Sequence, residues 1–380
     1  MSAVAEAPEP LTAEDAWFMR AALALGRRGL GQVWPNPAVG ALVVRHGPAG
    51  PVVVGRGWTQ PGGRPHAETE ALRRAGNLAR GATLYVTLEP CSHHGKSPPC
   101  ADVIVAAGVS TVVSALEDPN PEVAGTGHAR LRAAGISVRS GVGALEAARV
   151  HAGQCCRITE NRPAVTLKLA ISADGKVGRA GRRPIAITAE RARDRVHRLR
   201  AMHDAVAIGI GTALADDPLL TCRLPGMDRR SPIRVVLDSE LRLPLGGRLA
   251  ASAGEFPLWI LASETASPDR EASLRARGAE IMRLPTAAPG RLELRAAMHL
   301  LAQRGITRVL LEGGPILAAA MLAENLVEEA ALFHSEMTIG PDGLDALEGM
   351  PLSALTASPP FHCVDREMLG PDRLDTFVLA

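Results

Sequence analysis

The chain has 380 residues, of which 46% are apolar and only 3% aromatic, and its formal net charge at pH 7 is +2. This length favours two domains over one. The balanced charge and the scarcity of aromatic rings argue against a nucleic-acid-binding protein, which usually has a basic surface and stacking side chains.

Residues 1–10 are rich in Ala, Glu and Pro and lack the apolar stretch of a secretory signal. No apolar run reaches the ~20 residues that a membrane-spanning helix needs. Six cysteines in a chain of this length do not form the pattern of a small disulfide-stabilised scaffold. We therefore expect a cytoplasmic protein with reduced thiols and no membrane partner.

Strand and helix patterns alternate in the first half, which predicts a layered α/β domain over residues 12–140. The helix at 65–76 is expected to have Pro65 just inside its start and Gly76 at its end. A linking helix is predicted at 141–162. The expected strands are 39–44, 52–54, 82–88 and 109–116, and a second helix is expected at 99–108.

A new alternation predicts a second α/β domain over residues 163–380. Residues 262–290, which are rich in Ala, Ser, Pro and Arg, are interpreted as connecting structure. The expected helices are 188–201 and 291–303, and the expected strands are 165–171, 205–210, 233–237, 258–261, 309–311 and 327–333.

Three short motifs, His66-Ala67-Glu68, Pro90-Cys91 and Pro99-Cys100, indicate a zinc site. One His and two Cys supply three ligands and leave a position for water, as in catalytic zinc centres. Together with Glu68, such a centre is typical of zinc deaminases, in which activated water replaces an amino group on a ring. Glu68 is predicted to move protons between that water, the ring nitrogen and the departing ammonia. Eight residues separate the two cysteines, whereas the general signature of zinc deaminases has P-C-x-x-C. The alternative is a closed structural site with His93 or His94 as fourth ligand, in which Glu68 has no use.

The second half lacks the dinucleotide fingerprint G-x-G-x-x-G. It does contain Glu312-Gly313-Gly314-Pro315 after a predicted strand. The glycines permit close approach to the backbone, and Pro315 suits the first position of a helix whose N-terminus could receive a phosphate. A tight strand-to-helix turn is the alternative interpretation.

Further motifs occur in order along both halves of the chain. In the first half these are Pro35-Asn36-Pro37, Val39-Gly40, Pro65-His66-Ala67-Glu68, Leu88-Glu89-Pro90-Cys91-Ser92-His93, Gly95-Lys96, Pro98-Pro99-Cys100 and Asp118-Pro119-Asn120-Pro121. In the second half they are Thr166-Leu167-Lys168-Leu169-Ala170, Ser172, Asp174-Gly175-Lys176, Gly211-Thr212, Ala215-Asp216-Asp217-Pro218, Leu220-Thr221 and Leu311-Glu312-Gly313-Gly314-Pro315. With these motifs, the chain resembles the bifunctional deaminase–reductase family of riboflavin biosynthesis over residues 14–378, and the cysteine spacing is the one that this family uses.

The resemblance implies a cytidine-deaminase-like three-layer domain followed by a dihydrofolate-reductase-like domain, both of the α/β class. It implies that 2,5-diamino-6-(5-phosphoribosylamino)pyrimidin-4-one first loses its 2-amino group as ammonia. The ribosyl chain of 5-amino-6-(5-phosphoribosylamino)uracil is then reduced to ribityl. The implied cofactors are Zn²⁺ and NADPH, the implied partner is a small pyrimidine ribonucleotide, and the family forms dimers or larger homo-oligomers through the reductase half.

The resemblance also assigns individual residues. Lys168, Asp216 and Glu312 join Glu68 as catalytic candidates, unless Lys168 is a surface lysine at a strand edge. Thr59 stands where many relatives have His. The implied contacts of the deaminase substrate are Asn36, Lys96 and Asn120, and those of the reductase substrate are Pro184, Arg200, Leu220, Arg223 and Glu312. The implied NADPH contacts are Ala170, Ala186, Thr212, Asp216, Ser239, Gly314, Pro315, Ile316, Leu317, Ala318, Ala319 and Ala320.

Two other functions share part of the pattern. A deaminase acting on single-stranded nucleic acid would use the same zinc chemistry, but it needs a basic groove and stacking aromatic side chains. A non-enzymatic zinc-binding regulator would have no use for Glu68. Ammonia release from the free pyrimidine nucleotide, compared with release from RNA, distinguishes these functions.

Overall fold

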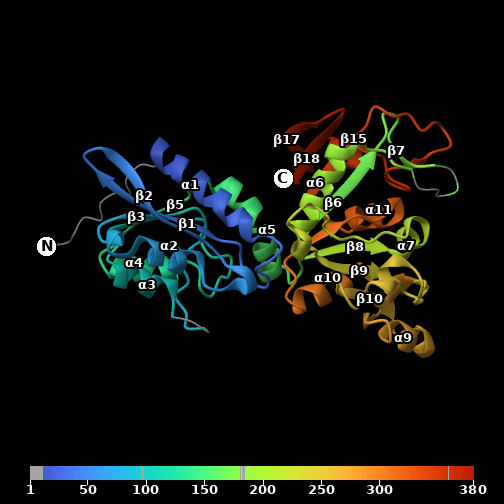
Figure 1. The fold of residues 1–380 in the computed structure, drawn as a ribbon, viewed down its shortest axis with the longest axis horizontal. Helices are drawn as coiled ribbons and strands as arrows, with labels where there is room; N and C mark the ends of the chain where they lie inside the picture. The colour runs from blue at the N-terminus through green and yellow to red at the C-terminus, as the bar shows by residue number, and fades with distance from the viewer. Residues whose placement is uncertain (1–11, 96–97, 180, 182–184, 289, 358) are drawn as a thin grey trace. The chain divides into compact units, whose positions relative to one another are not determined.

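The computed structural model describes residues 12–95, 98–179, 181, 185–288, 290–357 and 359–380. The chain divides into two compact units, with the boundary between Glu160 and Asn161 (Figure 1). Among the described residues, no helix is both long and apolar enough to cross a membrane.

The first unit is built on one sheet with the strand order β2-β1-β3-β4-β5. Strand β1 is antiparallel to β2 and to β3, whereas β3, β4 and β5 are parallel. Strands β2, β3 and β4 therefore run in the same direction and end at the same edge of the sheet. The elements are α1 (Ala13–Gly26), β1 (Gly40–Gly47), β2 (Gly50–Trp58), α2 (Ala67–Ala75), β3 (Thr83–Val86), α3 (Cys100–Ala107), β4 (Thr111–Ser114), α4 (Thr126–Ala133), β5 (Ser137–Ser140) and α5 (Ala144–Thr159).

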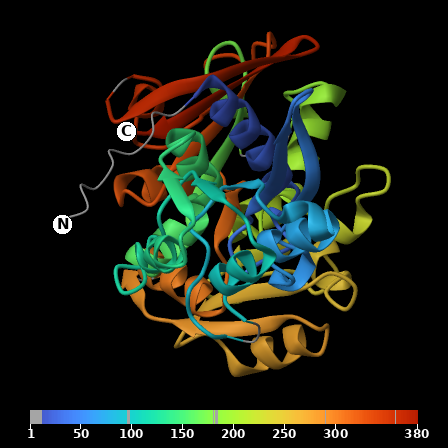
Figure 2. The same ribbon diagram turned by 90° about the vertical axis from the view of Figure 1, so that its left-hand side faces the viewer.

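Helices cover both faces of this sheet. Along β1, Ala41 and Val43 pack toward α2 and α3, while Leu42 and Val44 pack toward α1 and α5. Such alternation follows from the two-residue period of a strand. Figure 1 shows the two helical layers, and Figure 2 shows α1 beside α5. The first unit thus has the three layers that the family resemblance implies.

Helix α2 differs in one detail from the prediction. It begins at Ala67 with His66 as its N-cap, so Pro65 lies outside the helix rather than just inside it. Gly76 does end the helix, with a φ of 54° that suits glycine. The observed start leaves the His66 side chain outside the first turn.

A buried carboxylate fastens α1 to the sheet. Asp15 is 2% exposed, and its two oxygens accept hydrogen bonds from Arg139 of β5 at 2.7 and 3.0 Å. The Tyr85 hydroxyl of β3 donates to it at 3.0 Å. Asp15 also closes a capping box with Thr12, so one side chain joins a helix start to two strands.

The second unit is built on a larger sheet with the order β11-β10-β9-β8-β14-β6-β15-β18-β17. Neighbouring strands are parallel from β11 to β15, and β18 and β17 add an antiparallel hairpin. The elements are β6 (Ala164–Ile171), β7 (Lys176–Gly178), α6 (Glu190–Ala201), β8 (Ala205–Gly209), α7 (Ile210–Asp216), β9 (Ile233–Leu237), α8 (Arg248–Ala251), β10 (Leu258–Ser263), α9 (Pro268–Arg275), β11 (Glu280–Leu284), β12 (Thr286–Ala288), β13 (Arg291–Leu292), α10 (Leu294–Gln303), β14 (Arg308–Leu311), α11 (Pro315–Ala323), β15 (Glu329–His334), β16 (Leu344–Asp345), α12 (Ser353–Thr356), β17 (Phe361–Leu369) and β18 (Asp372–Leu379).

The order of the parallel strands reverses between β8 and β14. After β8 the chain passes through α7 to β9 on one side, whereas after β14 it passes through α11 to β15 on the other side. Because such crossovers are right-handed, the two connections leave the sheet on opposite faces. In open α/β sheets, this reversal opens a crevice at the carboxyl ends of the strands, where ligands bind.

The interpretation of residues 262–290 as connecting structure is wrong. This stretch contains α9 and β11, and β11 pairs with β10 as the outermost parallel strand. Leu274, Ile281 and Leu284 are buried there, so a few apolar residues suffice to fix both elements among many Ala, Ser and Arg.

We expect Asp15→Ala to lower the free energy of unfolding by about 3 kcal/mol, because it leaves the Arg139 guanidinium without its buried partner. Unfolding can be followed by fluorescence, since Trp17, Trp34 and Trp58 are three of the four tryptophans and all lie in the first unit. Burial raises the pKa of Asp15, but bonds with Thr12, Tyr85 and Arg139 bring that pKa below its ordinary 3.8. The difference in the free energy of unfolding between Asp15→Ala and wild type should therefore shrink only as the pH falls below 3.8.

The control for this measurement is Glu14→Ala. Glu14 is the neighbouring acid in α1, and its partner His46 is exposed to solvent. That substitution should change stability by no more than about 0.5 kcal/mol. Equal losses in both variants would contradict the anchoring role of Asp15.

Candidate functional site

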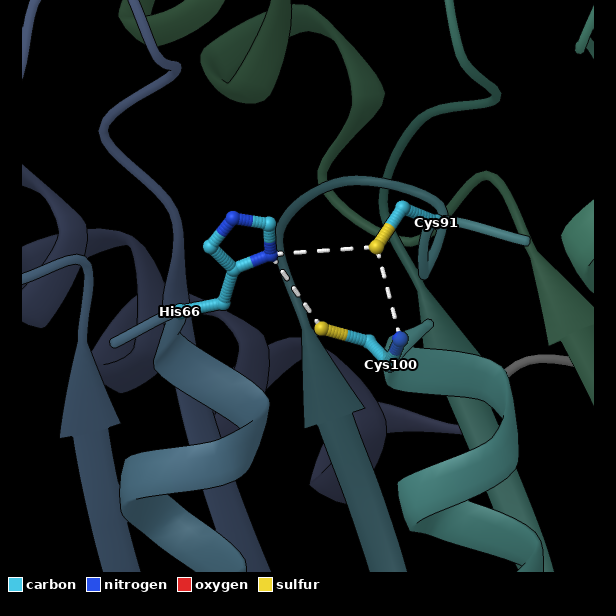
Figure 3. Close-up of side chains that lie close together, drawn as sticks. All are labelled: His66, Cys91 and Cys100. Carbon is cyan, nitrogen blue, oxygen red and sulfur yellow. Dashed lines mark hydrogen bonds between the residues drawn. The ribbon is translucent and has the colours of Figure 1, made fainter. Parts of the chain in front are cut away.

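Three metal-binding side chains meet at the edge where β2 and β3 end. His66 precedes α2, Cys91 lies in the loop after β3, and Cys100 is the first residue of α3. Nδ1 of His66 lies 3.3 Å from Sγ of Cys100 and 3.7 Å from Sγ of Cys91 (Figure 3). All three ligand atoms lie within 4.8 Å of one another.

This donor set suits Zn²⁺. One imidazole nitrogen and two thiolates are ligands that zinc prefers, and three protein ligands leave a position open. The N-termini of α2 and α3 both lie at the cluster, and the positive ends of helix dipoles favour anionic sulfur. The hydrogen bond from Cys100 lowers the pKa of the Cys91 thiol to about 4, against the effect of burial. The thiolate form of Cys91 is therefore accessible, whereas the same hydrogen bond and burial raise the pKa of the Cys100 thiol, which keeps its proton until a metal replaces it.

The closed structural site with a fourth histidine finds no support in the geometry. The cluster found among the described residues contains His66, Cys91 and Cys100 and neither His93 nor His94. Both of these histidines are exposed, and Nε2 of His94 lies 4.0 Å from the Asp102 carboxylate instead.

Glu68 lies beside the cluster in the first turn of α2. Its side chain is buried, at 4% exposure, and lies close to the Cys100 thiol. Burial raises the pKa of Glu68, and the nearby Cys91 raises it further. A carboxyl group with a raised pKa can both accept and return a proton, which is what general acid–base catalysis requires.

Around this cluster the structure places Asn36 and Thr59 in one packed loop region. The Asn36 amide packs on Gly63, where a Cβ atom would come within 1.9 Å of Nδ2. The Thr59 hydroxyl donates to the Pro37 carbonyl at 2.9 Å and accepts from the Val39 N–H at 3.0 Å. Thr59 therefore holds the segment that follows Asn36. Lys96 and Pro184, both predicted to contact substrate, lie outside the described residues.

The second unit contains a buried ion pair at the edge where β14 ends. The Arg200 guanidinium of α6 donates to both oxygens of Glu312, from Nε at 2.6 Å and from Nη2 at 2.8 Å. The two side chains are 12% and 9% exposed. Burial alone would raise the pKa of Glu312, but Arg200, with Lys168 and His197, brings it below its usual range. Glu312 is therefore an anion.

Lys168 adds a further charge to this pair. It lies on β6, between β14 and β15 in the middle of the sheet, so it is not a surface lysine at a strand edge. Burial lowers the pKa of Lys168, and the charges of Glu312 and Asp216 oppose that shift. Residues far apart in the chain thus converge: Lys168, Arg200, Asp216 and Glu312.

Two arginines and a histidine surround Thr221 in the same region. The Thr221 carbonyl accepts from Nη1 of Arg200 at 3.2 Å and lies 3.0 Å from Nδ1 of His197. Nη1 of Arg223 lies 3.4 Å from the Thr221 hydroxyl. Leu220, just before, is 2% exposed and has a φ of 58°. Sequence reasoning missed His197, whose only signal was its place one turn before Arg200.

Most of the predicted cofactor residues lie near the carboxyl ends of β6, β8 and β9 or in the helix that follows β14. A Cβ atom at Gly314 would lie 3.2 Å from Oγ1 of Thr212, so α7 and α11 begin side by side. Ser239 follows β9, and its hydroxyl donates to the Gly290 carbonyl at 2.8 Å. Within α11, which Pro315 begins, Ile316 is exposed, Leu317 and Ala320 are half-buried, and Ala318 and Ala319 are buried. Ala170 is half-buried and Ala186 is exposed.

Comparisons with known proteins agree with both halves of the fold. Residues 12–116 match the cytidine and deoxycytidylate deaminase zinc-binding region, and residues 163–372 match the RibD C-terminal domain. The riboflavin biosynthesis protein RibD of Escherichia coli (strain K12) is 38% identical over 94% of this chain and 98% of its own length. RibD of Aquifex aeolicus (strain VF5) is 36% identical over 86% of this chain and 88% of its own length.

Solved structures lead to the same family. Acinetobacter baumannii RibD, form 1, has a TM-score of 0.82 at 32% identity and covers 97% of this chain and 99% of that chain. A Thermotoga maritima diaminohydroxyphosphoribosylaminopyrimidine deaminase/5-amino-6-(5-phosphoribosylamino)uracil reductase has a TM-score of 0.80 at 34% identity and covers 96% of this chain and 99% of that chain. A zinc-binding deaminase domain followed by a reductase domain defines a bifunctional enzyme, and the expected fold class is confirmed. The chain belongs to the RibD family of riboflavin biosynthesis proteins.

We expect Cys91→Ser and Cys100→Ser each to lower the zinc content well below one ion per chain, because a hydroxyl replaces a thiolate ligand. Elemental analysis of the purified protein measures this directly. Cys363→Ser is the control, since Cys363 is exposed on β17, far along the chain in the second unit. Full zinc occupancy in both ligand variants would rule out the assignment.

Proposed function

We propose that the first unit hydrolyses the 2-amino group of 2,5-diamino-6-(5-phosphoribosylamino)pyrimidin-4-one, with Zn²⁺ held by His66, Cys91 and Cys100. The observation that carries this proposal is the compact cluster of one nitrogen and two sulfur atoms with a buried carboxylate beside it. The name of the Thermotoga maritima relative supports the choice of substrate.

Bound zinc supplies a Lewis acid that makes water reactive near neutral pH. The protein's own contribution is the proton pathway. Glu68 takes one proton as water adds to the ring carbon and gives it to the ring nitrogen, and it then carries the second proton from the added oxygen to the amine, which leaves as ammonia. Its burial beside the cluster raises the pKa of the Glu68 carboxyl, which favours taking up the proton that it has to pass on. Asn36 and Asn120 hold the pyrimidine ring, and Lys96 meets the substrate phosphate.

We infer that the second unit reduces the ribosyl chain of 5-amino-6-(5-phosphoribosylamino)uracil with NADPH. The crevice between β8 and β14 supports this proposal, because nucleotide cofactors bind where strand order reverses. Thr212 and Gly314 line up at the starts of α7 and α11, and the N-terminus of α11 suits a cofactor phosphate. The remaining residues of the cofactor site are Ala170, Ala186, Asp216, Ser239 and the stretch 315–320.

The charged cluster beside this crevice suits the substrate of the reductase. Arg200 and Arg223 are fitted to bind its phosphate, since guanidinium groups bind phosphate in a bidentate manner. Glu312 keeps Arg200 oriented and is itself a hydrogen-bond acceptor for ribose hydroxyls. Lys168 and Asp216 exchange protons as the ribose ring opens for hydride transfer. A homo-oligomeric assembly through this unit and a cytoplasmic location stay predictions from the sequence.

We expect Glu68→Gln to keep one zinc per chain and to lose ammonia release by about 10²–10⁴-fold, because the amide has the same shape but cannot carry the proton. Glu70→Gln is the matched control in the same helix, since Glu70 is buried and pairs with Arg73 and Arg74 instead. Ammonia production from the diamino substrate is measured for both variants. A Glu68→Gln enzyme within a few-fold of wild type would mean that another group moves the proton.

We expect Asp216→Ala to lower NADPH oxidation with the deaminated substrate by about 10²-fold or more, because it removes a proton-exchanging group. The same variant should release ammonia from the diamino substrate at the wild-type rate, since each unit has its own core and site. Asp228→Ala, which removes an exposed carboxylate, is the control. Loss of ammonia release in folded Asp216→Ala would show that the two sites are not independent.

A further inference from the structure

The first unit contains a second group of side chains of the kinds that bind metal ions. The described residues Glu89, Glu117 and His128 bring one ligand atom each to within 4.8 Å of one another. Glu89 and His128 are buried, whereas Glu117 is exposed. His128 Nε2 already bonds with the Ser114 hydroxyl at 2.8 Å. Whether this group binds a cation depends on Glu89, which is two residues before Cys91.

Both oxygens of Glu89 accept main-chain hydrogen bonds. Oε1 accepts from the N–H groups of Gly127 and His128 at 2.8 and 3.1 Å. Oε2 accepts from the N–H groups of Asp118 and Gly125 at 3.0 and 2.9 Å. Four N–H donors directed at one carboxylate oppose a cation there, so the group is not a metal site.

These donors include the start of α4. The N-cap of α4 is Gly125, which has no side chain to satisfy the first N–H groups of the helix. Glu89 supplies that acceptor from another part of the chain, and its negative charge matches the positive end of the helix dipole. Helix α4 is thereby fastened to the loop that carries Cys91.

The close approach of α4 to this loop depends on Gly127. A Cβ atom at that position would lie 2.0 Å from the Pro90 carbonyl oxygen and 3.0 Å from Oε1 of Glu89. Any side chain there would push α4 away from the residue that precedes Cys91. Glycine is therefore required by packing rather than by its own φ.

The same carboxylate controls the position of Asn120. Glu89 holds the N–H of Asp118, and the Asp118 carboxylate accepts from the N–H of Asn120 at 2.9 Å. The Asn120 side-chain oxygen accepts from the Glu122 N–H at 3.1 Å, which closes the turn. The segment between β4 and α4 is thus tied at both ends, at Asp118 and at Gly125, to one side chain.

We propose that Glu89 is a positioning residue of the deaminase, which sets the distance between the Asn120 turn and the metal ligands. The inference rests on the proposed contact between Asn120 and the pyrimidine substrate. Glu89 itself touches neither substrate nor metal. Its effect passes along the main chain, forward to Cys91 and through Asp118 to Asn120.

The sharpest test is Glu89→Gln. We call the four hydrogen bonds from main-chain N–H groups to the Glu89 carboxylate the clamp. The side-chain amide of Gln keeps one acceptor oxygen, but its NH₂ group faces two main-chain N–H donors and breaks one side of the clamp. We expect the KM for the diamino substrate to rise about tenfold. An amide nitrogen at the Oε2 position releases both ends of the Asn120 turn, and one at the Oε1 position releases the start of α4, into which that turn leads. The kcat, expressed per bound zinc, should stay within about threefold of wild type. NADPH oxidation by the same protein should not change.

Glu117→Gln is the matched control, because it removes a charge from the same group without touching the clamp. A Gly127→Ala variant attacks the clamp from α4 and should raise KM in the same way. A purely structural role would lower stability or yield while leaving KM per zinc-loaded enzyme unchanged, and that result would overturn the proposal. Loss of zinc from Glu89→Gln would overturn it too, since the clamp would then serve the metal loop. Failure of both clamp variants to fold would have the same meaning.

A double variant separates this proposal from the assignment of Asn120. If Glu89 acts through Asn120, Glu89→Gln should change KM little further in an Asn120→Ala background. Multiplying effects would overturn the proposed connection. An unchanged KM in Asn120→Ala alone would instead remove the substrate contact from the proposed function, and Glu89 would then lose the residue it positions.

Discussion

The first main-chain N–H groups of a helix need hydrogen-bond acceptors, and in the first unit Cys91 and Glu89 are among those acceptors. Strands β2, β3 and β4 end at one edge, so α2, α3 and α4 begin near one another. The N–H of Cys100 points at the Cys91 sulfur, at 3.3 Å, and those of α4 point at Glu89. The backbone thus favours negative charge on Cys91, which would hold the metal, and on Glu89, which fastens α4 beside it.

The second unit has a different constraint, because several of its charged side chains are buried on a largely apolar sheet. Glu312 ends one parallel strand and Arg200 projects from a helix packed on the same sheet, and each is buried only because the other is present. Lys168 adds an ammonium group beside this pair, and burial lowers the pKa of that group. Burying these charges is costly for stability alone, and such clusters are frequent at functional sites, which supports the reductase site proposed above.

The sequence predicts features that depend on neighbours in the chain. His66, Cys91 and Cys100 stand in short motifs, and the main strands follow from runs of Val, Ile and Leu. It does not predict Asp15 with Arg139 or Arg200 with Glu312, whose partners are 124 and 112 residues apart. Helix α1 has no counterpart among the predictions, and neither has the β17–β18 hairpin, because most of β17 is exposed on both faces and lacks a strand's alternation. In the sequence Glu89 stands out only as part of a motif, since nothing local indicates that four main-chain N–H groups surround it.

Eight residues separate Cys91 from Cys100, but the positions of these two ligands depend on how the ends of the loop are closed rather than on its length. The ends of this loop are closed by the Cys100 N–H on the Cys91 sulfur and by the Ala101 N–H on the Cys91 carbonyl, at 3.1 Å. Doubling the length of a flexible loop adds only about 0.6 kcal/mol to its closure cost. A longer loop between the two ligands would therefore cost little stability, provided that these two hydrogen bonds still close its ends. The closure of the loop ends is therefore a better criterion for this kind of metal centre than the spacing of its cysteines along the chain.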